Sequence, residues 1–343
     1  MPVFSGLLPR VKTHLIVNPN AGRRNGLALA ESVRKTLASA SIEASIHVSA
    51  YPGETVELAG AIARQAAAVH APETSARPDG AIAPQEARST EAVLPSIIAV
   101  GGDGTLFEML NGLMTGWNAE GIGSGKAPDP IPFPIGQIPV GTGNSFIRDL
   151  GIETPDEAAE AIMAGTTRAV DLGTFSCSAG RFVFINLLGA GFVSSVAHRA
   201  ARYKRWGSLS YVIGVLQETL ALAPGRLTLH VDGTTIQRDA LFVEICNSRY
   251  TGGEMCMAPG AKIDDGLLDV VVMTRATRRK LLTLFPKIFS GTHVEDPVIE
   301  VFQGRSVRVE TEPPWLLTPD GEIFGSTPID VSILPGHLRM YHR

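Results

Sequence analysis

The chain has 343 residues, of which 44% are hydrophobic, and it carries 30 basic against 34 acidic side chains. Such a length can bury a large core and indicates two domains. The formal net charge of −4 argues against extensive contact with nucleic acid, which requires a basic surface. The cysteines, Cys177, Cys246 and Cys256, lack the spacing of a metal cluster, so a reduced cytoplasmic protein is favoured over a disulfide framework.

No stretch of the chain has the composition of a membrane segment. The first residues, MPVFSGLLPRVK, lack a long apolar core, and apolar runs of about 18 residues are absent from the sequence. We therefore expect a soluble protein that meets a membrane, if its ligand is a lipid, only at the surface.

Short apolar segments alternate with segments of helical period up to about Arg168, an order typical of a parallel α/β domain. The expected strands are residues 14–18, 43–49, 96–100 and 135–139. The expected helices are residues 27–40, 54–70, 105–115 and 155–164. Residues 71–95 and 116–130 have no apolar period and are interpreted as surface insertions or loops.

After Ala169 the sequence changes to short strand-like runs separated by Gly, Pro and Asp turns. The runs are AVDLGTFS, RFVFINLLG, RLTLHVDG, ALFVEICNS, LLDVVVM, VIEVFQ, SVRVETE and EIFGSTPIDVSIL. Many short strands with such turns favour a β-sandwich or a barrel. A segment of helical pattern, residues 192–222, interrupts them.

The most informative turn is Gly101-Gly102-Asp103-Gly104-Thr105, which lies between an apolar run and a helical segment. A glycine turn that leads into a helix presents unpaired backbone N–H groups and the positive end of the helix dipole, which suits a phosphate. Asp103 beside a phosphate requires a magnesium ion or a hydroxyl proton between the two negative groups. An Asp at this place is also an ordinary helix cap.

Two further turns follow apolar runs: Gly141-Thr142-Gly143-Asn144, and Asn18-Pro19-Asn20-Ala21-Gly22. Taken alone, each is a common type of turn between a strand and a helix. Three of them in one α/β region indicate phosphoryl chemistry.

Five segments together resemble the diacylglycerol kinase catalytic-domain family, which includes bacterial lipid kinases and the sphingosine and ceramide kinases. They are VNPNAG at 17–22, GGDGT at 101–105, PVGTGN at 139–144, GGEMCMAPGAKIDDGLLDVVVM at 252–273 and PDGE at 319–322. Soluble NAD kinases and phosphofructokinases share the GGDG element, whereas the two later segments favour the lipid-kinase branch.

The resemblance implies an α/β N-terminal domain of the NAD kinase and phosphofructokinase type, residues 1–168. It implies a mainly antiparallel β-sandwich as the C-terminal domain, residues 169–326. The last residues, 327–343, are expected to pack back on the first domain, with the active site in the cleft between the two.

The same resemblance implies that ATP and Mg²⁺ are the cofactors, with Asp103 near the phosphates and the metal as a catalytic residue. The nucleotide-binding residues that it implies are Asn18, Ser49, Gly101, Gly102, Gly104, Thr105, Gly141, Thr142 and Asn144.

A second acidic segment, IDDGLLD, could be a plain turn into a strand, because Asp-Gly is a common hairpin signal. The resemblance implies instead a magnesium site formed by the Asp265 carboxylate and the backbone carbonyls of Lys262 and Leu267, oxygen ligands that suit a hard cation. Whether that ion is catalytic or structural stays open.

The resemblance matches Glu322 to the general base that accepts the proton of the lipid hydroxyl. A structural turn is the other interpretation of PDGE, and Asp103 and Asp320 are rival candidates for the base. The chain departs from the bacterial pattern at Ser145, where an Asp is usual, which puts the ion network and the substrate in doubt.

The leading interpretation is an ATP-dependent kinase of a lipid hydroxyl, on diacylglycerol or a sphingoid-type lipid. The alternatives are a kinase of a soluble acceptor, as in NAD kinase, and a non-catalytic nucleotide-binding regulator. The expected partner is a lipid at the membrane surface, reached from the cytoplasm at the inner face, and a homodimer is compatible with this interpretation. RATRRK followed by LLTLFPKIF, at 275–289, is either a solvated face or a contact with an anionic membrane.

Overall fold

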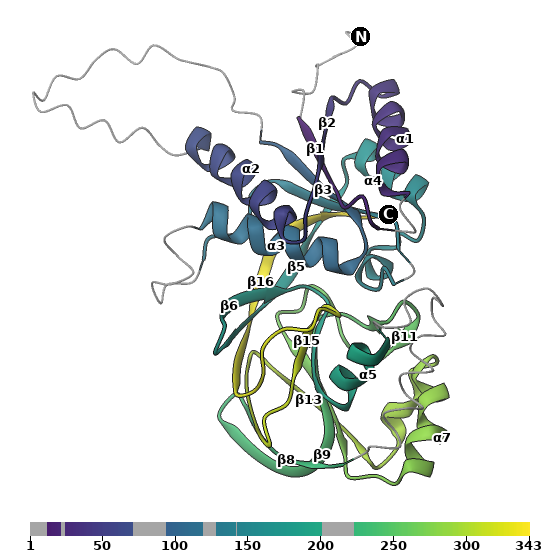
Figure 1. Cartoon of the computed structure of the whole chain (residues 1–343), viewed down its shortest axis with the longest axis vertical. Coiled ribbons are helices and arrows are strands. Elements are labelled where there is room, and N and C mark those ends of the chain that lie inside the picture. The colour runs from purple at the N-terminus through teal and green to yellow at the C-terminus, as the bar shows by residue number, and fades with distance from the viewer. Residues whose placement is uncertain (1–11, 22–24, 71–93, 119–127, 142, 201–222) are drawn as a thin grey trace, which may run out of the picture.

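The computed structural model describes residues 12–21, 25–70, 94–118, 128–141, 143–200 and 223–343. An α/β part occupies the upper half of the view in Figure 1, and a β-rich part lies below it. The last strand, coloured yellow, runs from the lower part into the upper one, where the C-terminus lies.

The α/β part contains a parallel sheet whose strands lie in the order β4-β3-β1-β2. Its strands are β1 (Thr13–Val17), β2 (Ala44–Val48), β3 (Ser96–Gly101) and β4 (Pro134–Pro139). Its helices are α1 (Gly26–Ser39), α2 (Glu54–His70), α3 (Asp103–Trp117) and α4 (Pro155–Ala164). The sequence-based assignments of these elements are confirmed to within two residues at either end. β1 and β3 are buried along their whole length, as expected of strands covered on both faces.

The loop expected from Gly116 begins later, because Gly116 and Trp117 still belong to α3. A Cβ atom on Gly116 would lie 2.3 Å from the carbonyl oxygen of Gly60 in α2, so the absence of a side chain lets the two helices pack closely. Within the other expected loops, residues 71–93 and 119–127 lie outside the described part of the chain.

The β-rich part confirms the change to antiparallel strands. Its strands are β5 (Thr167–Cys177), β6 (Gly180–Phe184), β7 (Leu187–Gly191), β8 (Gly225–Val231), β9 (Thr234–Cys246), β10 (Tyr250–Thr251), β11 (Met255–Cys256), β12 (Leu268–Thr274), β13 (Ile299–Gly304), β14 (Ser306–Glu312), β15 (Leu317–Pro319) and β16 (Ile329–Tyr341). Its longer helices are α5 (Phe192–Ala200) and α7 (Arg278–Ile288), and residues 201–222 of the expected helical segment lie outside the described residues.

Two strand assignments need correction. RFVFINLLG forms two strands rather than one, because the backbone amides of Ile185 and Asn186 turn away to bind the Asp320 carboxylate. EIFGSTPIDVSIL becomes a strand only from Ile329, since a left-handed Gly325 (φ 69°) lies in the stretch before it. The segment at 275–289 is largely the helix α7, which the sequence-based analysis left unassigned.

β16 joins the two parts. Its first half pairs antiparallel with β14, and it pairs antiparallel with β5 from Asp330 to Tyr341. Arg339 and Met340 near its end also pair parallel with β4. The described residues thereby form one mixed sheet of 14 strands, with β16 between β14 and β4. The chain thus has an α/β N-terminal part and a β-sandwich-like C-terminal part around a mixed sheet, while the exact domain boundaries stay a prediction.

Within the described residues, no helix is both long enough and apolar enough to cross a bilayer.

Candidate functional site

The glycine turns gather at one edge of the parallel sheet. Asn18 follows β1, Ser49 follows β2, the GGDGT turn closes β3 and the GTGN turn follows β4. The carboxyl ends of parallel strands meet at the same edge, which is where open α/β sheets bind their ligands. Helix α3 begins at Asp103 with Gly102 as its cap, so its first N–H groups face this edge.

Two of the predicted nucleotide-binding residues have hydrogen bonds within the α/β part. The Asn18 amide nitrogen donates to Oγ1 of Thr105 across 3.4 Å, which links the turns after β1 and β3. Ser49 is buried, and its hydroxyl donates to the carbonyl oxygen of Val17 across 3.2 Å. The geometry therefore brings Asn18 and Thr105 together, whereas the hydroxyl of Ser49 already has a backbone partner.

The GTGN turn lies against the GGDGT turn. The backbone N–H of Ser145 donates to both carboxylate oxygens of Asp103, at 3.1 and 2.9 Å. Asn144 has a positive φ of 49°, and its side-chain nitrogen donates to the carbonyl oxygen of Gly141 across 2.8 Å. Oδ1 of Asn144 is buried and has no hydrogen-bond partner among the residues that the structure describes. An unpartnered acceptor at this edge suits a ligand with a donor group. Thr142 lies outside the described residues.

Asp103 is half-buried beneath these turns. Burial raises the pKa of its carboxyl, while hydrogen bonds from the backbone and hydroxyl of Ser145 act in the opposite direction. Ser145 also accepts the N–H of Gly253 at 2.8 Å. The residue that departs from the family pattern therefore ties Asp103 to the β-rich part.

The acids of the PDGE turn occupy very different surroundings. Asp320 is buried, and it accepts backbone N–H groups from Ile185, Asn186 and Leu187 at 3.0, 2.9 and 3.1 Å. Burial and the nearby charge of Asp103 raise the pKa of Asp320 to about 7. With its oxygens bound to backbone amides, Asp320 holds the turn in place, which favours Glu322 over Asp320 as the base.

Glu322 is exposed, and its carboxylate lies over the first turn of α3. A Cβ atom on Gly104 would lie 2.3 Å from Oε1 of Glu322, so only a glycine leaves room for the carboxylate there. The fold thereby places the Glu322 carboxylate at the start of the helix that Asp103 opens. This contact could not be inferred from the sequence, because the two segments are far apart along the chain.

The proposed metal residues lie on another turn, just before β12. Asp265 is exposed, and its Oδ1 accepts the N–H of Leu267 across 3.0 Å. Behind this turn, burial and then the charge of Asp265 raise the pKa of Asp171, and Oδ2 of the buried Asp269 has no hydrogen-bond partner. This excess of negative charge and the oxygen donors, including the Lys262 carbonyl, suit a hard cation. Within the described residues, no three His, Cys, Asp or Glu side chains cluster as a metal site.

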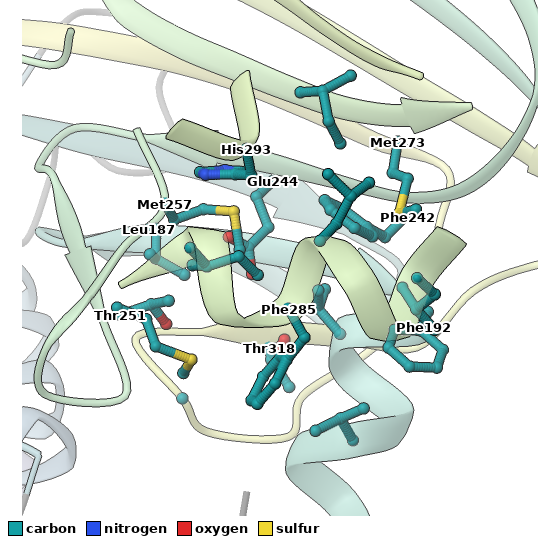
Figure 2. A pocket seen from close by; sticks show the side chains of 18 residues that line it. Leu187, Phe192, Phe242, Glu244, Thr251, Met257, Met273, Phe285, His293 and Thr318 are labelled. Atoms are coloured by element: carbon teal, nitrogen blue, oxygen red, sulfur yellow. The ribbon is translucent and has the colours of Figure 1, made fainter. Parts of the chain in front are cut away.

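An apolar pocket lies in the β-rich part, next to the PDGE turn. Its cavity volume is about 90 Å³, and its mouth opens to solvent. Figure 2 shows side chains of Leu187, Phe192, Phe242, Met257 and Phe285 around it. Gly321 lines the same pocket, so its wall continues directly into Glu322. Such an apolar cavity beside polar groups is typical of a site for a ligand with an apolar body.

Comparison with known proteins agrees with this arrangement. The family described as "Diacylglycerol kinase catalytic domain" matches residues 12–175, and "YegS C-terminal NAD kinase beta sandwich-like domain" matches residues 186–342. A diacylglycerol kinase of Mycobacterium tuberculosis (strain CDC 1551 / Oshkosh) is 34% identical over 260 residues, which cover 74% of this chain and 77% of that protein. The chain belongs to the diacylglycerol kinase catalytic-domain family.

Further relatives place this family member among the lipid kinases. The "Probable lipid kinase YegS" of Salmonella newport (strain SL254) is 30% identical over 71% of this chain and 77% of its own length. The fold is also that of a crystal structure of a diacylglycerol kinase from Bacillus anthracis str. Sterne, with a TM-score of 0.67 and 22% identity over 98% of both chains. The predicted family and fold class are confirmed, whereas the roles of the individual site residues stay predictions.

The sequence-based analysis of this lipid-kinase family member missed one residue of the pocket, Glu244. It lies near the end of β9, is buried and lines the pocket. The available signal was a single acidic residue within the apolar run ALFVEIC. An acid is rarely fully buried without a partner, so this position calls for an explanation.

Proposed function

We propose that this protein is an ATP-dependent lipid kinase that transfers the γ-phosphate of ATP to a lipid hydroxyl. The observation that carries the proposal is the position of the Glu322 carboxylate, which lies over Gly104 at the start of α3 and beside the wall of the apolar pocket. A base at this place has the phosphate-binding turns on one side and room for a lipid on the other.

The nucleotide side rests on the paired turns after β3 and β4. We infer that the phosphates of ATP bind N–H groups of the GGDGT turn at the start of α3, where the helix dipole favours negative charge. Asn144, with its unpartnered Oδ1, offers an acceptor for a donor group of the ligand. In this proposal Asp103 keeps the two turns together through Ser145 and adds its carboxylate to the phosphate region.

Magnesium, when bound, would neutralise phosphate charge as it does in other phosphoryl transfers. Asp103 would hold that ion beside the phosphates. The turn that carries Lys262, Asp265 and Leu267 would hold an ion through oxygen donors, and its hydrogen bonds lead to Asp171 in β5. We assign that second position to stability of the turn, because its nearest charged neighbours belong to β5 and β12.

The acceptor side rests on the apolar pocket. A lipid whose tails occupy the pocket would present its hydroxyl near Gly321, one residue from Glu322. Glu322 is exposed and therefore accessible to that hydroxyl. Phosphoryl transfer requires positioning and a carboxylate that accepts the hydroxyl proton, and Glu322 supplies the second.

Helix α7 is the part that we propose contacts the membrane. Leu281 and Leu284 face the pocket and are buried, whereas Leu282 and Phe289 at the outer side are 41% and 51% exposed. Arg279 and Lys287 are exposed on the same segment. Basic and apolar groups in one exposed helix fit an anionic bilayer surface, from which a lipid could enter the pocket.

The direct test measures phosphate transfer from radiolabelled ATP to several acceptors under one set of conditions. The panel contains dioctanoylglycerol and sphingosine in mixed micelles, with NAD and fructose 6-phosphate as soluble acceptors. We expect transfer to a lipid and none to the soluble acceptors. Transfer only to a soluble acceptor would contradict the proposal, and ATP binding without any transfer would favour a nucleotide-binding regulator.

The Glu322→Gln variant tests the base. It keeps the volume and hydrogen-bonding reach of the side chain but removes its basicity, so kcat should fall by roughly 10²–10⁴-fold. ATP affinity, measured by equilibrium titration, should stay close to wild type, because the glycine turns hold the nucleotide. Wild-type kcat in this variant would return the role of base to Asp103 or Asp320.

A further inference from the structure

Glu244 stands out because it is a buried acid within an apolar wall. The residue is 4% exposed and lines the apolar pocket, and its Oε2 has no hydrogen-bond partner in the described part of the chain. Figure 2 shows its carboxyl among apolar side chains of the pocket. Burial raises the pKa of Glu244 to about 8, so its carboxyl is mainly protonated near pH 7 and can donate a hydrogen bond.

The strand register directs this carboxyl toward the PDGE side of the pocket. Glu244 of β9 pairs with Gly189 of β7, which in turn pairs with Thr318 of β15. A Cβ atom on Gly189 would lie 3.3 Å from Oε1 of Glu244 and 3.0 Å from Oγ1 of Thr318. The missing side chain of Gly189 therefore lets the Glu244 carboxyl and the Thr318 hydroxyl come close together, beside a methyl group of Val193.

Of these two groups, the Thr318 hydroxyl already has partners. Oγ1 of Thr318 lies 3.0 Å from Oγ of Ser194 and 3.3 Å from the carbonyl oxygen of Gly189. Ser194 also donates to the Gly189 carbonyl, at 3.1 Å. Among the described residues, the atom left without a partner is Oε2 of Glu244, and an unpaired polar atom in apolar surroundings is costly.

The distance to the proposed base limits which part of a lipid would reach Glu244. Thr318 precedes Glu322 by four positions, and Gly321 between them lines the same pocket. Four residues span at most about 14 Å, so Thr318, which neighbours Glu244 across Gly189, lies within that distance of the proposed base along the chain. That region of a bound glycerolipid contains the ester groups, which follow the free hydroxyl closely, rather than the ends of the acyl chains.

We propose that Glu244 is a specificity residue that donates a hydrogen bond to an ester carbonyl of a diacylglycerol acceptor. The inference rests on the proposed function, since it assumes that the hydroxyl faces Glu322. A protonated Glu244 carboxyl favours the diester over a sphingoid base. The amine of a sphingoid lipid is itself a donor and would need an ionised carboxylate as its partner.

The test compares two acceptors that share the free hydroxyl and differ only in the linkage, 1,2-dioctanoylglycerol and the diether 1,2-dioctylglycerol. For the wild-type protein we expect the KM of the diester to be roughly tenfold lower than that of the diether, with similar kcat. Glu244→Leu should remove this preference by raising the KM of the diester. Glu244→Gln, which keeps a donor, should retain it.

Met257→Leu serves as the matched control, because it changes another buried side chain of the same pocket without removing a donor or an acceptor. Equal KM values for both acceptors in the wild type would overturn the proposal, and so would a preference that survives Glu244→Leu. Loss of the preference in Glu244→Gln would overturn the donor role. If Glu244→Leu fails to fold, Glu244→Met replaces it.

Binding of the same pair, measured by equilibrium titration without ATP, separates the two proposals. A diester preference in binding that depends on Glu244, with no phosphate transfer, would contradict the proposed kinase activity and leave the role of Glu244 supported. Phosphate transfer to a lipid with equal binding of diester and diether would support the proposed kinase activity and contradict the role of Glu244.

Discussion

The glycine-turn edge of the α/β part and the pocket of the β-rich part differ in whether their acidic side chains have hydrogen-bond partners. Asp103 receives hydrogen bonds from the adjoining GTGN turn, whereas Glu244 is buried among apolar side chains and its Oε2 has no partner. An acid bound by the backbone fixes the shape of a site. An acid without a partner can form a hydrogen bond with a ligand. The comparison therefore separates Asp103, which maintains the structure of the site, from Glu244, which we propose recognises the substrate.

Of the changes in the glycine-turn edge and in the pocket, Asp103→Asn should have the largest effect on phosphate transfer. We expect this change to lower the rate of phosphate transfer by about 10²–10³-fold, since it removes a charge at the phosphate-binding turns. The amide still accepts a hydrogen bond from Ser145, so the unfolding temperature should change little. Phosphate-transfer assays and thermal unfolding measure these two effects. Wild-type turnover in the variant would show that Asp103 has only a structural role, connecting the two turns.

Gly104→Ala tests whether the contact between the two segments matters for catalysis. The added methyl group would overlap Oε1 of Glu322 and displace the carboxylate, which should lower kcat by about 10²-fold while the helix remains intact. In the double variant Gly104→Ala/Glu322→Gln the losses should not add, and full additivity would show that the methyl group acts elsewhere.

Glu244→Gln should change the pH dependence of stability. The pKa of Glu244 rises from 4.5 to about 8 on folding, so between these pH values the folded protein binds the extra proton and loses stability as pH rises. The free energy of unfolding of the variant does not decrease in this way. Its difference from the wild-type value should therefore grow in favour of the variant by up to about 1.4 kcal/mol per pH unit from about pH 5 to pH 8. Urea unfolding at several pH values measures it, with exposed Glu43→Gln as the control. A constant difference across this range would contradict the burial of an unpaired carboxyl.

Asp320→Asn should have the smallest effect on catalysis and act mainly on stability. The amide offers only one acceptor oxygen to the N–H groups of Ile185, Asn186 and Leu187. We expect a loss of roughly 1–3 kcal/mol in the free energy of unfolding and a smaller loss of kcat than in Glu322→Gln. If Asp320→Asn abolishes kcat and Glu322→Gln does not, the base is Asp320.

The sequence predicted well what depends on neighbouring residues. The strands and helices of the α/β part follow from apolar period, and the Thr154 capping box at α4 shows why residues 155–164 were assigned correctly. The glycine turns were located for the same reason.

Features that depend on residues far apart in the chain were not accessible in this way. The placement of Glu322 over Gly104, the break between β6 and β7 around the Asp320 carboxylate, and the unpaired state of Glu244 arise only when distant strands pair. A local pattern contains no information on those pairings.

The last strand has a consequence for how the molecule comes apart. Ile329, Val331 and Ile333 of β16 belong to the hydrophobic core of the β-rich part, whereas Leu338 and Met340 belong to that of the α/β part. Releasing this one strand strips side chains from both cores at once and breaks the sheet between them. Denaturation should therefore be a single cooperative event. Neither the α/β part nor the β-rich part should fold as a separate fragment when it lacks β16.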